Sequence, residues 1–107
     1  MKIAIPTNDK QTIAKRSGQA KWFGIFEIEN SVIISQAFLE NNHEHHHHHD
    51  HEEGEHTHED MIALLKDCSL MIAQKVGPHF GRELKGAKID IKLTELENID
   101  EALKLVL

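Results

Sequence analysis

Alternating polar and apolar residues in the first part of the chain predict β-strands. Residues 2–6 read as a first strand, and 21–29 read as a second strand rich in aromatic and β-branched residues. Asn30-Ser31 favours a two-residue turn, after which 32–40 returns as the partner strand. Residues 7–20 contain few apolar positions and predict a long loop between the first two strands.

Helical spacing dominates the later part of the chain. A helix capped by Thr57 should carry one apolar face, formed by Met61, Leu64, Leu65 and Cys68. A helical turn is expected to open at Gly77-Pro78, and Gly86 should end it. Asn98 should cap a final helix whose apolar stripe consists of Ile99, Ala102, Leu103 and Val106.

Two further strands separate these helices. Residues 69–73 form a short apolar run typical of a strand buried on both faces. Residues 88–93 alternate strictly and predict a half-exposed strand with Ile89, Ile91 and Leu93 on one face. Hairpins followed by β-α-β crossovers indicate an α/β fold with a mixed sheet. At 107 residues the chain forms one domain, 1–107.

The net charge of −6 is unevenly distributed. Eight acids and no Lys or Arg lie between Glu40 and Asp60, which leaves 12 basic residues against 10 acids, or +2, elsewhere. This distribution disfavours nucleic acid and favours small cations. No apolar run approaches the roughly 20 residues needed to cross a bilayer, and we expect no membrane partner and no signal peptide.

Cys68 is the only cysteine, so neither an internal disulfide nor a multi-cysteine metal motif can form within one chain. A cytoplasmic location is the simplest interpretation. Because Cys68 lies on an apolar helical stripe, we expect a buried and inert thiol.

A histidine-rich insert spans residues 43–58 and contains little that could be buried. Neutral imidazoles bind zinc, nickel, copper and iron, and nearby carboxylates can complete a coordination shell. The alternative is a solvated linker that binds metal only adventitiously. The candidate metal ligands are His43, His45, His46, His47, His48, His49, His51, His56 and His58.

A second candidate site follows the strand at 69–73. Gly77 permits close backbone approach, His79 could ligate a metal, and Arg82 could balance an anionic cluster. The alternative is a tight turn in which His79 merely contacts solvent. The histidines crowd into one loop and no fixed catalytic grouping is visible, so we do not expect an enzyme.

Several motifs follow one another along the chain: the opening Met-Lys-Ile-Ala-Ile-Pro-Thr-Asn-Asp, the strand Trp22-Phe23-Gly24-Ile25-Phe26-Glu27-Ile28, the histidine-rich insert, Asp67-Cys68-Ser69-Leu70-Met71-Ile72-Ala73, Gly77-Pro78 and Ile99-Asp100-Glu101-Ala102-Leu103. In this order they resemble the dinitrogenase iron–molybdenum cofactor biosynthesis family. Family members often carry a His-Phe-Gly motif in the loop after the first strand. Within residues 14–20 of this chain only Gly18 and Ala20 fit the family's pattern, so the ligand histidine that the resemblance implies there is absent.

The resemblance implies a ribonuclease-H-like, three-layer fold with a mixed five-stranded sheet ordered 3-2-1-4-5. It also implies a carrier of an iron–sulfur or iron–molybdenum-type cluster that meets a cofactor-assembly protein. Two rival functions remain: a buffer or chaperone for a metal ion such as nickel, zinc or copper, and a protein-interaction module that uses a sheet edge. A monomer or a weak homodimer fits all three.

We predict that metal binding by the insert weakens steeply below about pH 6, because protons compete for imidazoles with pKa values near 6.5. Isothermal titration with zinc across this range measures the effect. An affinity that stays flat down to about pH 5 would instead indicate carboxylate ligands, whose pKa values lie near 4.

Overall fold

The computed structural model describes residues 1–41 and 59–107 and contains a mixed five-stranded sheet of order β3-β2-β1-β4-β5. The strands are β1 (Lys2–Thr7), β2 (Trp22–Glu29), β3 (Val32–Glu40), β4 (Leu70–Ala73) and β5 (Asp90–Leu93). The helices are η1 (Ser17–Gln19, a 3-10 turn), α1 (Glu59–Leu64), α2 (Pro78–Gly86) and α3 (Ile99–Leu103). The α/β class and the strand order are confirmed, and the ribonuclease-H-like class fits them.

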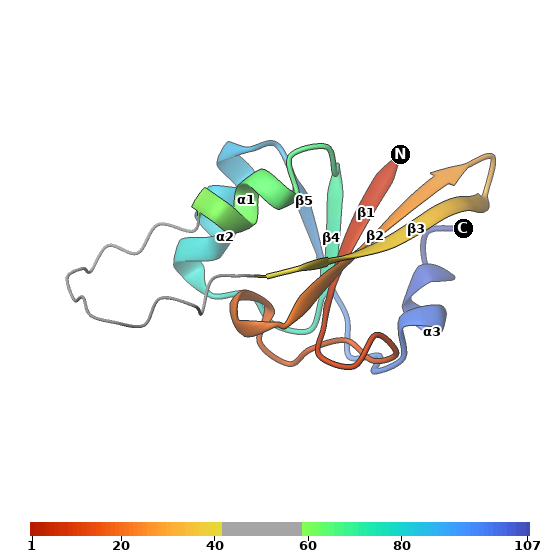
Figure 1. Ribbon diagram of the computed structural model, residues 1–107, viewed down its shortest axis with the longest axis horizontal. Helices are drawn as coiled ribbons and strands as arrows, with labels where there is room; N and C mark the ends of the chain where they lie inside the picture. Colours follow the sequence, from red (N-terminus) through yellow and green to blue (C-terminus); the bar gives the residue numbers. More distant parts are fainter. Residues whose placement is uncertain (42–58) are drawn as a thin grey trace.

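Helices cover both faces of the sheet, which gives three layers (Figure 1). On the face of α1 and α2, residues such as Ala4, Phe23 and Leu84 form one core cluster. On the face of α3, Ile3 and Ile5 join a second cluster. The period-two alternation of β1 therefore supplies both cores, because successive side chains of a strand point to opposite faces. No helix in the described part of the chain is long and apolar enough to span a membrane.

The hairpin between β2 and β3 turns at the predicted dipeptide. Asn30 has φ 54° and Ser31 has φ 64°. Two successive residues in the left-handed region match the twist of antiparallel strands, and asparagine tolerates this region better than most residues. The predicted two-residue turn is confirmed.

The predicted caps of the later helices are also confirmed. Gly77 precedes α2, which has a proline in its first turn and Gly86 as its last residue. The Asn98 side chain accepts hydrogen bonds from the backbone N–H groups of Asp100 and Glu101 at the start of α3. The proposed Thr57 cap lies outside the described residues.

Two sequence expectations need correction. The helix expected to run to Cys68 ends at Leu64, and Leu65 and Cys68 are buried from the turn that follows it. The carbonyl of Leu65 accepts a hydrogen bond of 2.8 Å from the N–H of Cys68, so the turn keeps helix-like spacing. Leu93, expected on one apolar face with Ile89, is 62% exposed, because it is the last residue of β5, which lies at the edge of the sheet.

Gly24, on β2, lies under two aromatic rings, those of Phe26 on the same strand and Phe38 on β3. A Cβ atom added there would come within 2.9 Å of Phe26 and 3.0 Å of Phe38. These two rings meet edge-to-face with centroids 6.1 Å apart. Glycine thus lets the rings close over the sheet, a close approach that compensates for its poor β propensity.

We predict that Gly24→Ala destabilises the protein by about 1–3 kcal/mol, because the new methyl group overpacks a buried ring. Denaturant unfolding followed by circular dichroism measures this change. Alanine loses less backbone entropy on folding than glycine, which by itself would stabilise the variant. A stabilised variant would therefore contradict the packing argument.

Candidate functional site

Three loops meet at one end of the sheet, beyond the carboxyl ends of β1, β4 and β5, because these strands run parallel. Residues 8–21 follow β1, 74–77 follow β4, and 94–98 follow β5. In α/β sheets, ligands bind in the crevice outside the carboxyl ends of the strands. We call these three segments the carboxyl-end loops.

Hydrogen bonds join the carboxyl-end loops to one another. The buried Ser17 hydroxyl donates to the carbonyl of Lys75 at 2.6 Å. The Gln74 side-chain amide donates to the carbonyl of Leu96 at 2.8 Å. The N–H of Ile13 donates to the carbonyl of Glu97 at 2.8 Å. Each loop is therefore held by another, so the surface they form is preorganised.

Asp9 fixes the start of the first loop. Its carboxylate accepts hydrogen bonds from the N–H groups of Thr12 at 2.7 Å and Gln11 at 2.9 Å, and from the Thr12 hydroxyl. These bonds, that from the Thr12 backbone first, lower the pKa of Asp9. Lys10 has φ 66° and holds its ammonium 4.7 Å from the centre of the Trp22 ring. Asp9 thus has a structural role within its turn.

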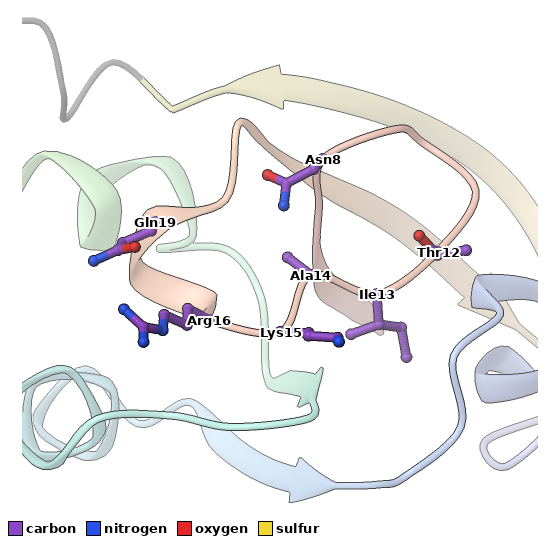
Figure 2. Close-up of a pocket in the computed structure, with 7 residues that line it drawn as sticks. All are labelled: Asn8, Thr12, Ile13, Ala14, Lys15, Arg16 and Gln19. Carbon is purple, nitrogen blue, oxygen red and sulfur yellow. The ribbon is translucent and has the colours of Figure 1, made fainter.

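An open pocket of about 430 Å³ lies along the first loop. Two cations and no acid line it, so the pocket favours a negatively charged ligand. Figure 2 shows the side chains of Arg16 and Gln19 extending to the same side of η1, whereas Lys15 points the other way. The lining residues are Asn8, Thr12, Ile13, Ala14, Lys15, Arg16 and Gln19.

Sequence reasoning missed this pocket. It noted the absence of a histidine ligand between residues 14 and 20 but gave no weight to the adjacent basic residues Lys15 and Arg16. Two neighbouring cations in the loop after the first strand were the available signal. Only the tertiary structure shows that Asn8 and Gln19 line the same pocket.

The second predicted site is only partly assembled. His79 and Arg82 are exposed on the first turns of α2, with Arg82 Nη2 3.3 Å from His79 Nδ1. Guanidinium can only donate, so Nδ1 accepts in this arrangement and is not available to a metal ion while Arg82 stays there. Gly77 has open space around it, as close backbone approach requires.

Cys68 lies at the opposite end of the sheet, just before the amino end of β4. It is buried with 6% exposure, and burial raises the pKa of its thiol to about 11. A protonated thiol is a poor metal ligand and a poor nucleophile. The predicted buried thiol is confirmed.

Among the side chains that the structure describes, those of residues 1–41 and 61–107, no group of three or more His, Cys, Asp and Glu could hold a metal ion. The nine candidate ligands between His43 and His58 lie outside the described residues. The described loops therefore offer charge and hydrogen bonds to a ligand, and one histidine that is already engaged.

Comparison with known proteins identifies the family. The whole chain, residues 1–107, matches the family model described as dinitrogenase iron-molybdenum cofactor, and the chain belongs to this family. No match was found among curated protein sequences.

Solved structures share the fold. The crystal structure of PH0822 has a TM-score of 0.77 at 18% identity, covering 99% of this chain and 89% of that one. The NMR structure of MJ0327 from Methanococcus jannaschii has a TM-score of 0.76 at 18% identity, covering 99% and 85%. The apo form of the orange protein from Desulfovibrio gigas has a TM-score of 0.73 at 16% identity, covering 98% and 85%.

We predict that Cys68 reacts with a disulfide reagent at least about a hundredfold more slowly in the native protein than in the denatured chain. At pH 8 a thiol with a pKa of about 11 is ionised in only about one molecule in a thousand, and burial also blocks access. Absorbance of the released thiolate measures the rates. Native labelling at the denatured rate would show that the thiol is accessible.

Proposed function

We propose that this protein is a non-catalytic carrier of an anionic metal cluster of the iron–sulfur or iron–molybdenum type. The observation that carries the proposal is the cationic pocket held by the carboxyl-end loops. Membership of the iron-molybdenum cofactor family supports a cofactor-related role. The cluster is cargo, and the protein binds it reversibly for a partner that assembles the cofactor.

The available side chains favour recognition of charge over thiolate ligation. Cys68 is buried at the far end of the sheet, so it does not meet a ligand at the carboxyl-end loops. Lys15 and Arg16 line the pocket. A guanidinium can donate two parallel hydrogen bonds to an anion, which adds orientation to attraction.

The histidine-rich segment supplies the direct metal ligands in this proposal. Asn41, the last described residue before it, donates from its side-chain amide to the carbonyl of Ala20 at 2.9 Å. The N–H of Asn41 also donates to the carbonyl of Lys21 at 2.8 Å. The chain therefore enters this segment directly beside η1, whose Gln19 lines the pocket. Imidazoles from residues 43–58 could complete the coordination of a cluster bound there.

Two groups, Asp9 and Cys68, have shifted pKa values, and both shifts have a structural cause. This is consistent with binding without catalysis. The lowered pKa of Asp9 results from hydrogen bonds that hold a turn, and the raised pKa of Cys68 results from burial. Neither arrangement presents a proton donor or a nucleophile to the pocket.

A divalent-metal buffer is the second candidate function, favoured by nine histidines within sixteen residues. It requires only residues 43–58, whereas the cluster carrier also requires the cationic pocket. The two functions therefore respond to different variants.

We expect Lys15→Ala/Arg16→Ala to weaken binding of thiomolybdate, an anionic metal–sulfur probe, by about tenfold, because the pocket loses both of its cations and, with Arg16, a charge-assisted contact. Zinc binding should not fall. Deletion of 43–58 should abolish tight zinc binding and leave part of the thiomolybdate affinity. Titration calorimetry of untagged protein, with elemental analysis after anaerobic purification, measures both.

Lys66→Ala/Lys85→Ala is the matched control, because it removes two exposed cations elsewhere on the surface. Equal loss of thiomolybdate binding in both double variants would indicate only a general charge effect. Zinc binding without any thiomolybdate binding in the wild type would favour the buffer.

A further inference from the structure

The outer edge of β3 is long and poorly protected. Val32 is 57% exposed and Ile34 is 52% exposed, and residues 35–37 are also exposed. The nine-residue strand contains no proline, lysine or arginine, and Glu40 is its only charged residue. Natural edge strands usually carry such features to prevent pairing with another chain. The other edge strand, β5, is four residues long and exposes Asp90 and Lys92.

The alternation of hydrogen bonds determines which residues this edge presents. The N–H of Asn41 donates to the carbonyl of Lys21, the residue just before β2. The backbone groups of Asn41 therefore point toward β2. Residues of an antiparallel strand direct their N–H and C=O groups alternately to either side, so the backbone groups of Glu40, Phe38 and Gln36 point away from β2. The register shift opposite Glu27 and Ile28 ends this regular stretch near Ile34.

We propose that this edge pairs antiparallel with the same edge of a second copy of the chain. The two-fold axis passes beside Phe38, so that Gln36 lies opposite Glu40 of the second copy, and the two five-stranded sheets become continuous. This register uses only outward-facing backbone groups and avoids the irregular stretch near Ile34.

The side chains of the edge are self-complementary in this register. Gln36, Phe38 and Glu40 share the face covered by α3, since Phe38 packs in the cluster of that face and strand residues two apart point the same way. The amide of Gln36 can donate to the carboxylate of Glu40 across the pair. The two Phe38 rings meet at the axis, where aromatic cross-strand pairs stabilise sheets.

The other face and the charges agree with the same register. Ala37 is exposed and lies directly opposite the half-buried Leu39 of the second copy, so a small side chain meets a large one. The antiparallel arrangement also keeps the two Glu40 carboxylates at opposite ends of the paired segment. A parallel arrangement would place like charges side by side.

The contact is small, so we expect a weak dimer with a dissociation constant of the order of 0.1 mM. Sedimentation equilibrium of the full chain measures it. Gln36→Lys places a cation opposite Glu40 of the second copy and should tighten the dimer about fivefold. Gln36→Glu places two carboxylates together and should weaken it about fivefold.

Both substitutions are at an exposed position, and circular dichroism verifies that the fold is intact. Lys92→Glu on β5 is the matched control and should leave the dissociation constant unchanged. High salt should shrink the difference between the two Gln36 variants. A wild type that stays monomeric at about 1 mM would overturn the proposal. Charges of opposite sign at position 36 that shift the dimer in the same direction would also overturn it.

Discussion

β1 pairs antiparallel with β2 on one side and parallel with β4 on the other. The rest of the structure depends on this central position. Its residues Ile3, Ala4 and Ile5 have no exposed surface and contribute to both cores. Because β4 and β5 run parallel to β1, the loops after all three strands lie at the same end of the sheet. An antiparallel β4 would have placed the loop after β1 and the loop after β4 at opposite ends of the sheet, and the hydrogen bond from Ser17 to Lys75 could not form.

The carboxyl-end loops show how a small domain can build a preorganised surface from hydrogen bonds between its loops. Ser17 contributes its hydroxyl to the loop after β4, and Ile13 contributes its N–H to the loop after β5. These bonds satisfy backbone groups that a loop would otherwise leave to water. The cations of the pocket project from a framework that is already held, which reduces the entropy cost of binding an anion.

The two ends of the sheet differ in chemistry. The carboxyl end carries Lys15 and Arg16, and the opposite end buries the single thiol. Charge recognition and direct metal ligation are thus assigned to separate parts of the chain in the proposed carrier, since nine of the ten imidazoles lie in the segment that follows Asn41. The free edge of β3 lies between these features in sequence and offers a contact that depends on neither.

Local patterns in the sequence determined most of the elements, the caps and the turn. The Asn30-Ser31 dipeptide and the Asn98 cap are examples, because turns and caps depend on residues within a few positions. Periodicity also identified Leu65 and Cys68 as buried, although the helix ends before them. The strand order came from the family resemblance and not from periodicity. What only the tertiary structure decided is the pocket, whose loop is held by bonds from Ser17 to Lys75 and from Ile13 to Glu97, and the exposure of Leu93. Each depends on which distant segments meet or on where the sheet ends, and local periodicity carries no record of either.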